Sequence, residues 1–182
     1  FANSQNWTEG LATVSSLLTE LPLIQDKKLH HQALLISAIF YNQMGQYKLG
    51  LSYAKKVELT STQGRDNCIA KGLIIESSFK LKQLTPTNPI IRNAISLCRI
   101  NSEYLNISFI NHYVSKMHLE NLQKDKALEL LNSSLQDTLN TKYPRIIAEY
   151  YSLIAQAHWL NNNTELTKQF ALQALENENK EG

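Results

Sequence analysis

Apolar residues recur at spacings of three and four along almost the whole chain, which is the spacing of one face of an α-helix. Residues 26–44 and 47–60 show this spacing most clearly, with Gly45 between them as a permissive turn residue. Alternating runs typical of strands are nearly absent, and no Asn-Gly or Asp-Gly hairpin turn occurs. The pattern predicts an all-α fold with helices over residues 4–20, 26–44, 47–60, 65–83, 87–101, 103–121, 124–138, 144–161 and 164–177.

The helical pattern around Gly45 is repeated later in the chain. The aligned sets are Ala38, Tyr41, Gly45, Gly50 and Val57; Ser115, His118, Leu122, Ala127 and Ser134; and Ala155, His158, Asn162, Thr167 and Ala174. A looser copy spans residues 73–84 and 89–98, and residues 6–22 match the second half of one copy. The sequence therefore predicts four helical hairpins, with a period of about 40 residues, and an N-terminal half repeat.

This succession of small residue, aromatic residue, glycine, aromatic residue and two further small residues resembles the tetratricopeptide repeat. The resemblance covers essentially the whole chain, although the period is longer than the usual value of about 34 and several positions carry Ser or His instead. It implies a right-handed superhelix of about nine antiparallel helices, forming one array over residues 1–182. Each hairpin has an apolar side that only a neighbouring hairpin can cover, which explains the repetition. Because the chain starts within a repeat, we expect a segment of a longer protein.

The same resemblance implies a ligand-binding concave face, lined by the first helix of each hairpin. The positions that correspond to this face, and that we predict to bind a ligand or peptide, are Asn42, Gln43, Phe79, Lys82, His112, Lys116, Glu120, Gln156 and Trp159. Leu35, Ile39 and Ile75 fall on the same face. The mixture of amide, charged and aromatic groups suits an extended or helical peptide. An alternative assigns Ile39, Ile75 and Phe79 to the core, and Asn42, Lys116 and Trp159 to a solvated face without a ligand.

Charge and composition narrow the class of partner. The chain carries 18 basic and 16 acidic residues, mixed along its length, for a formal net charge of +2. No basic stripe of the kind that binds phosphate backbones occurs, so we expect no direct nucleic-acid binding. Hydrophobic content of 43% and mean hydropathy of −0.30 are ordinary for a globular protein, and no apolar run is long enough to span a membrane.

The sequence shows no recognisable catalytic or metal-binding motif. It lacks a glycine-rich phosphate loop, a His-Glu-x-x-His motif and a Gly-x-Ser-x-Gly motif. His30 and His31 are adjacent, so on a helix their side chains point about 100° apart and do not share one metal. We therefore predict no enzyme activity and no cofactor in this segment. Cys68 and Cys98 lie in apolar helical patterns, either as free buried thiols or as one bridge between neighbouring helices.

A second resemblance concerns residues 142–176, which look like the helical repeats that precede the membrane segment and output domain of GGDEF-type diguanylate cyclases. It implies a non-catalytic recognition or sensor domain of a bacterial signalling protein, binding a peptide or protein partner. By this resemblance the segment lies in the periplasm, is tethered to the membrane through flanking segments, and belongs to a protein with a diguanylate cyclase domain elsewhere.

Two alternatives belong to other functional classes. Similar long-period repeats hold signalling peptides in cytoplasmic transcription regulators. The other alternative is a structural scaffold that forms a homodimer through its end hairpins, with the half repeat at Trp7 as the contact edge. The sequence alone leaves the three functions and the compartment open.

Overall fold

The structure, a computed structural model, describes residues 7–181 of the chain. Nine α-helices and two short 3₁₀ helices, and no strand, occur in these described residues. The all-α prediction is therefore confirmed, and the predicted ends agree with the observed ones within three residues wherever both are described. Residues 4–6 of the first predicted helix lie outside the described residues.

The chain divides into two compact units, which we describe separately. Unit 1 comprises residues 1–84 and 88–101, and unit 2 comprises residues 85–87 and 102–182. The single array and the right-handed superhelix stay predictions.

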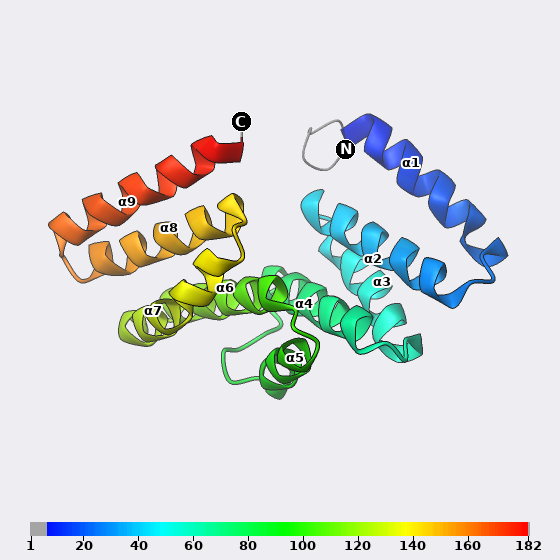
Figure 1. The fold of residues 1–182 in the computed structure, drawn as a ribbon, viewed down its shortest axis with the longest axis horizontal. Coiled ribbons are helices and arrows are strands. Elements are labelled where there is room, and N and C mark those ends of the chain that lie inside the picture. Colours follow the sequence, from blue (N-terminus) through cyan, green and yellow to red (C-terminus); the bar gives the residue numbers. More distant parts are fainter. Residues whose placement is uncertain (1–6, 182) are drawn as a thin grey trace. The chain divides into compact units, whose positions relative to one another are not determined.

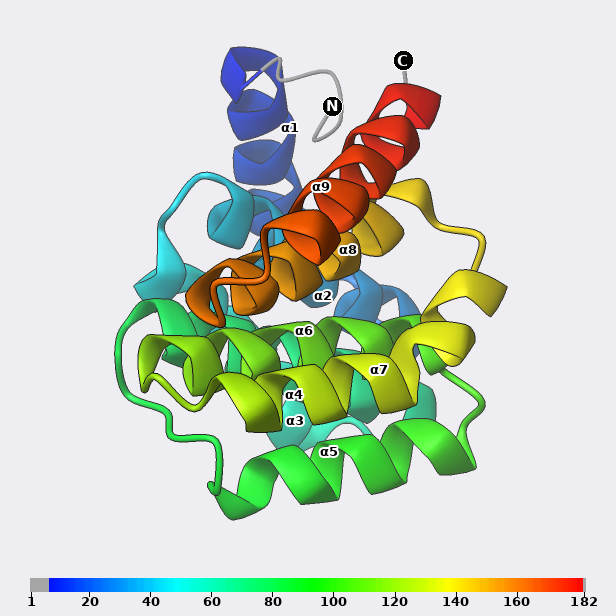
Figure 2. The same cartoon turned by 90° about the vertical axis from the view of Figure 1, so that its left-hand side faces the viewer.

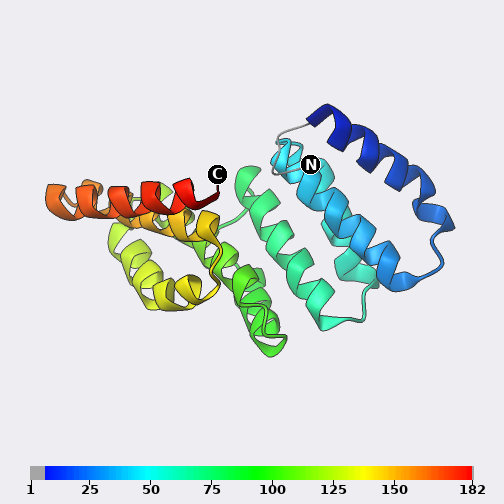
Figure 3. The ribbon, with the colours of Figure 1, turned by 45° about the horizontal axis from the view of Figure 1, so that its top comes forward.

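Unit 1 is built from five helices, each packed on its neighbour in the chain. They are α1 (Trp7–Glu20), α2 (Lys27–Gln43), α3 (Tyr47–Thr60), α4 (Gly64–Lys80) and α5 (Pro89–Ile100), with the 3₁₀ helix η1 (Leu21–Leu23) after α1. Helix α2 also contacts α4, so α1, α2 and α4 lie side by side in Figure 3. The core between α2, α3 and α4 holds aliphatic and small side chains such as Leu34, Ala38, Ala54, Val57 and Ile74.

Unit 2 repeats this arrangement with four helices. They are α6 (Tyr104–Glu120), α7 (Lys124–Asn140), α8 (Pro144–Leu160) and α9 (Thr164–Glu178), followed by the 3₁₀ helix η2 (Asn179–Glu181). Each helix packs on the next, and α6 also contacts α8, as α2 contacts α4 in unit 1. The antiparallel pair α8–α9 is visible in Figures 1 and 2. The core of this unit holds Leu119, Leu131, Ile146, Tyr150 and Ile154.

Four turns of the same conformation define the hairpins. The first helices α2, α4, α6 and α8 each have 17 residues. Each is followed by a residue in the left-handed region, which we call the αL residue: Gly45, Lys82, Leu122 or Asn162. At every turn the amide after the αL residue donates to a carbonyl five residues back, as Gln46 N does to Tyr41 O at 2.8 Å, which is the Schellman arrangement. The alignment of Gly45 with Leu122 and Asn162 is confirmed, and residues 7–181 form a repeat-like array of helices.

Burial follows the same register in all four first helices. The residues seven positions before the αL residue are Ala38, Ile75, Ser115 and Ala155, and all four are buried. The residues eight positions before it are Ser37, Ile74, Val114 and Ile154, and these are also buried. The repeat is therefore a packing repeat as well as a repeat of the turn.

Close helix contact within a hairpin depends on a small residue in its second helix. At Gly50 of α3, an added Cβ would lie 2.0 Å from Asn42 Oδ1 and 3.1 Å from the Ala38 carbonyl oxygen of α2. At the corresponding position of α7, Ala127 is completely buried. In these two hairpins a small residue thus lets the two helices approach closely.

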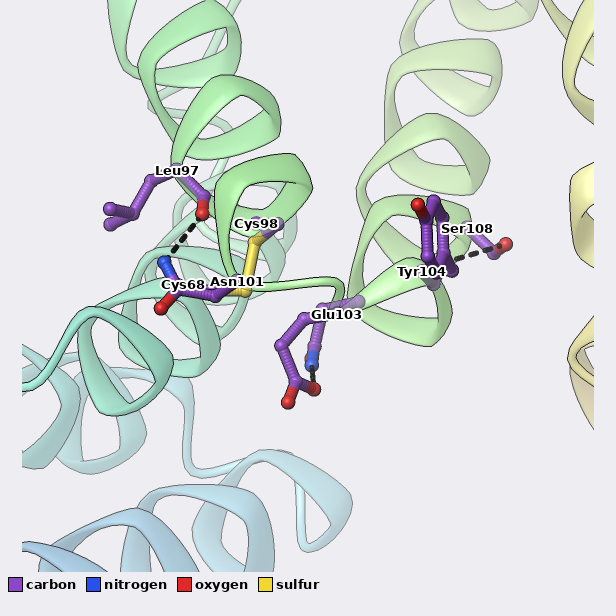
Figure 4. The surroundings of a disulfide bond; sticks show 8 residues. Cys68, Leu97, Cys98, Asn101, Glu103, Tyr104 and Ser108 are labelled. Carbon is purple, nitrogen blue, oxygen red and sulfur yellow. Dashed lines mark hydrogen bonds between the residues drawn. A yellow bond between two sulfur atoms is a disulfide. The ribbon is translucent and has the colours of Figure 1, made fainter.

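A disulfide between Cys68 and Cys98 joins α4 to α5 (Figure 4). Both cysteines are completely buried, and their Cα atoms lie 4.9 Å apart. Just beyond the bridge, the Asn101 side-chain amide donates to the Leu97 carbonyl oxygen at 2.8 Å and so satisfies one carbonyl at the end of α5. Of the two alternatives for the cysteines, the structure shows the bridge.

Candidate functional site

The outer surface of the first helices is set by two positions of the repeat, six and two residues before the αL residue. The six-before positions are Ile39, Glu76, Lys116 and Gln156, and the two-before positions are Gln43, Lys80, Glu120 and Leu160. All eight are exposed or half-buried. We call this surface the first-helix face, and in each unit we describe it separately. Four predicted ligand-binding residues lie on it: Gln43, Lys116, Glu120 and Gln156.

In unit 1 the first-helix face includes a row of exposed aliphatic side chains on α2. Leu29, Ile36 and Ile39 of α2 are 55%, 54% and 37% exposed. Their spacing of seven and three residues places them on one side of the helix. Single exposed aliphatic residues are common on protein surfaces, but three on one side of one helix form a row that a partner can cover. The neighbouring side of α4 contributes the half-buried Ile69 and Glu76.

In unit 2 the aliphatic row is not repeated on α6, where the equivalent residues are Asn106, Tyr113 and Lys116. Lys116 and Glu120 of α6 lie one helical turn apart. On α8, Arg145 Nε lies 3.4 Å from Glu149 Oε1, one turn along the same helix. Glu149 Oε2 also lies 3.4 Å from His112 Nε2 of α6 and so links the two first helices. The two units therefore present surfaces of different chemistry.

The predictions for Asn42, Phe79 and His112 as surface residues are wrong. They are 3%, 5% and 2% exposed, respectively. Asn42 shows the physical reason, because it lies three residues before the αL residue, where α2 faces α4. Its Nδ2 donates to Glu76 Oε2 at 2.9 Å, and its Oδ1 accepts from Ser77 Oγ at 2.8 Å. Asn42 is an interhelical contact of the interior.

Phe79 lies at the same three-before position of α4, and His112 packs towards α8 through its contact with Glu149. Ile75 is also completely buried. The alternative that assigned Ile75 and Phe79 to the core is therefore confirmed, whereas Ile39, at 37% exposed, is a surface residue.

Lys82 is also misplaced by the sequence prediction. It is the αL residue of the turn after α4, so it belongs to the connection between helices and not to the first-helix face. Its Nζ lies 5.2 Å from the centre of the Phe79 ring. The residues of α4 that do occupy the face are Glu76 and Lys80, which the sequence prediction missed. The sequence gives no signal for this turn, because the αL position carries lysine and not the glycine that marks a left-handed turn.

Trp159 occupies the three-before position of α8, yet it is 65% exposed. Its counterparts Asn42, Phe79 and Leu119 are all buried. Asn42 is covered by α4 and Leu119 packs in one core cluster with residues of α8, whereas no further first helix follows α9 within residues 7–181. Trp159 is thus on the surface, as predicted, but at the end of unit 2 and not on the first-helix face.

Two buried polar clusters connect helices within the units. In unit 1, His31 Nε2 lies 3.1 Å from Thr60 Oγ1, and His31 Nδ1 lies 3.8 Å from Asp66 Oδ2. In unit 2, the Tyr150 hydroxyl donates to the Ser108 carbonyl oxygen at 3.1 Å. Burial raises the pKa of the Tyr150 hydroxyl above its ordinary value, against the opposing effect of its hydrogen bonds. Because His31, Asp66 and Tyr150 are all buried, these clusters are suited to joining helices and not to meeting a substrate.

Unit 2 also has a hollow of about 450 Å³ where α6 begins and α7 ends. Its lining residues are Ser102, Glu103, Tyr104, Leu105, Asp137, Asn140 and Thr141. None of them is buried, so the hollow is an open depression without a desolvated group that could act as acid, base or nucleophile.

Among residues 7–181, no three His, Cys, Asp or Glu side chains lie close enough together to hold a metal ion. In the same range, no helix combines the length and the apolar character needed to cross a membrane. Comparisons of the chain with protein-family models, with curated proteins and with solved structures found no match.

Proposed function

We propose that this chain is a non-catalytic recognition domain of the tetratricopeptide-like type, which binds a peptide or protein segment on the first-helix face of unit 1. The observation that carries the proposal is the exposed row of Leu29, Ile36 and Ile39 on α2. Full burial of one such side chain contributes about 1.5–3 kcal/mol, and because about half of each is still exposed, covering the row contributes roughly 2–4 kcal/mol to holding a partner segment. A helical repeat supplies the rigid surface on which such a row is held.

The polar groups beside the row indicate what else the partner carries. Gln43 Oε1 is shielded from solvent and accepts no hydrogen bond from the residues that the structure describes. An acceptor that water cannot reach is equally closed to a partner at the surface, so this oxygen does not identify the partner. On the α4 side, Glu76 and Lys80 occupy the face. The partner is therefore a segment with aliphatic side chains and with polar or charged groups at its edge.

The disulfide supports an oxidising compartment for the chain. Bridges of this kind persist outside the cytosol and are rare inside it. A periplasmic sensor segment of a bacterial signalling protein, with a GGDEF-type output domain elsewhere, fits this compartment better than a cytoplasmic transcription regulator does. Scaffolding through Trp7 is less favoured, because the Trp7 ring already packs at 6.2 Å from the Phe40 ring of the same chain.

The test is selection of binding peptides from a displayed library, followed by titration of the best peptide with variants of the whole chain. Ile36→Asp and Ile39→Asp each place a charge in the row and should weaken binding about 10- to 100-fold, as expected for loss of one buried aliphatic side chain. The melting temperature should change little in Ile36→Asp and fall modestly in Ile39→Asp, because Ile36 is 54% exposed and Ile39 only 37%; circular dichroism should show that both variants are folded at the temperature of the titration. The matched control is Leu59→Asp on α3, where the leucine is 83% exposed but lies off the first-helix face.

A selection that yields no peptide, or peptides whose affinity survives both Ile variants, would refute the proposal. Equal loss of binding in the Leu59 variant would show an unspecific effect of added negative charge.

A further inference from the structure

The end of unit 2 carries an open copy of a surface that is covered elsewhere in the same chain. In the hairpin α2–α3, on which α4 packs, five positions are buried: Leu35, Asn42, Gly50, Ala54 and Val57. The equivalent positions of α6–α7 are buried where α8 packs: His112, Leu119, Ala127, Leu131 and Ser134. In α8–α9 the same five positions are Ser152, Trp159, Thr167, Ala171 and Ala174, and none of them is buried. We call these five residues the end seat.

The contrast is large for individual residues. Leu119 is 5% exposed, and Trp159 at the equivalent position is 65% exposed. Ala54 and Leu131 are completely buried, whereas Ala171 is exposed. Helix α9 as a whole contains no buried residue, although α3 and α7 each contain several. The end seat is therefore built like the two covered surfaces and lacks a covering helix within the described residues.

The two covering helices share a side-chain pattern. In α4 the buried residues include Leu73, Ile74 and Ser77, and in α8 they include Leu153, Ile154 and Ala157. Each helix thus presents a Leu-Ile pair followed, three residues after the isoleucine, by a small residue. These residues lie on one side of the helix. The two covering helices therefore indicate which side chains a helix needs in order to pack on such a surface.

A hydrogen bond shows how the covering helix is aligned. Asn42 Oδ1 accepts from Ser77 Oγ at 2.8 Å, so the three-before position of the host faces the small residue of the covering helix. In the end seat that host position is Trp159. A small residue opposite the indole leaves room for the larger ring, while Ala171 and Ala174 leave room for the Leu-Ile pair.

We propose that the end seat binds an amphipathic α-helix of this pattern, a Leu-Ile pair followed by Ala or Ser one turn later. The helix lies across α8 and α9 as α4 lies across α2 and α3, and it buries Trp159. This surface consists of other residues than the row on α2, so the proposal can be tested independently of the proposed function.

The experiment uses the whole chain with Trp7→Phe, so that Trp159 is the remaining tryptophan, and a synthetic peptide with the sequence of residues 64–80 in which Cys68 is replaced by Ser. Binding should move the emission of Trp159 to shorter wavelengths, because the peptide removes the indole from water. Ala171→Glu should weaken binding at least tenfold, since it places a charge within the seat. The control Leu172→Glu should stay within twofold, because the equivalent positions Lys55 and Asn132 are exposed in the covered hairpins.

A second peptide, with Leu73 and Ile74 both replaced by Ser, should leave the Trp159 emission unchanged. No binding of the first peptide, or equal binding to the Ala171→Glu variant, would overturn the proposal. Sedimentation of the chain alone gives another decisive outcome. A dimer that Ala171→Glu dissociates, and that the peptide does not disrupt, would make a second copy of the chain the occupant and would also overturn it.

Discussion

Reduction of the bridge between Cys68 and Cys98 provides a quantitative test of how unit 1 is held together. Helix α5 packs on α4, and the bridge fixes it there with both sulfur atoms in the interior. Reduction leaves both thiols in place, so the apolar packing of the folded state changes little. The main effect falls on the unfolded chain, which gains freedom when a closed loop opens.

The sequence separation of 30 residues sets the magnitude. For a loop of this length the chain-entropy relation gives a loss of about 12 cal/mol/K on closure, or about 3.6 kcal/mol at 25 °C. We therefore expect reduction to lower the free energy of unfolding of unit 1 by about 3–4 kcal/mol. With an m-value of about 1–3 kcal/mol/M, the urea midpoint should fall by roughly 1–4 M.

Urea unfolding of the Trp159→Phe variant, followed by fluorescence, measures this, because Trp7 then reports on unit 1 alone. The comparison is between samples with and without a phosphine reductant, with the number of free thiols counted by alkylation and mass measurement. The control variant, with both cysteines replaced by Ala, should have the same urea midpoint with and without the reductant. An unchanged midpoint in a sample with two free thiols would refute the reasoning.

Three further predictions concern an interhelical contact, the turns and the titration of a buried tyrosine. Asn42→Ala should lower the free energy of unfolding by about 1–3 kcal/mol, because it leaves the buried partners of Asn42 unpaired. Gly50→Ala should lower it by about 1–3 kcal/mol as well, because its Cβ would meet Asn42 Oδ1 at 2.0 Å. In urea titrations the double variant should lose less stability than the sum of the two single losses, and strict additivity would contradict the contact. Gly45→Ala should lower the free energy of unfolding by about 1 kcal/mol, because φ is +75° and, with nothing within 4 Å of the new Cβ, backbone strain is the only effect. Leu122→Gly, at φ 58°, should raise it by up to about 1 kcal/mol. Melting temperatures that shift in the same direction in both variants would contradict the turn assignment. Because burial raises the pKa of Tyr150, the folded state favours the neutral phenol, so its contribution to stability is intact below pH 10 and falls as the pH rises further. Denaturant titrations from pH 8 to 11 should show a smaller loss in the Tyr150→Phe variant, and an identical loss would contradict this.

The fold could be predicted because local signals agreed with the tertiary structure. Spacings of three and four residues gave the helices, and the alignment of Gly45, Leu122 and Asn162 gave three of the four equivalent turns. These features depend on residues close together in the sequence, whose effect is felt within one hairpin.

The surface was harder to predict because exposure depends on which helix covers which. Asn42 and Trp159 occupy the same repeat position, but one is covered by α4 and the other has no covering helix within the described residues. In the second hairpin, the turn falls on Lys82, which carries no turn signal, so the prediction chose Phe79 and Lys82 where Glu76 and Lys80 lie on the face. An amide or a charged residue on a helix is an ambiguous sign, because each is found both in water and in paired interior contacts.

The buried hydroxyl groups of unit 2 have a consequence for the fidelity of assembly. Thr138 Oγ1 of α7 lies 3.0 Å from Ser108 Oγ of α6, and the Tyr150 hydroxyl of α8 reaches the Ser108 carbonyl at 3.1 Å. In a protein made of similar helices, apolar surfaces alone would let a helix slide by one turn or pair with the wrong neighbour at little energetic cost. Thr138 and Ser108 also bond carbonyls of their own helices, at 3.0 and 3.2 Å, but the Tyr150 hydroxyl has its partners on α6 and α7. Mispairing would leave this hydroxyl unpaired in the interior, at about 1–3 kcal/mol. Tyr150 therefore favours one alignment of α6, α7 and α8 over the others.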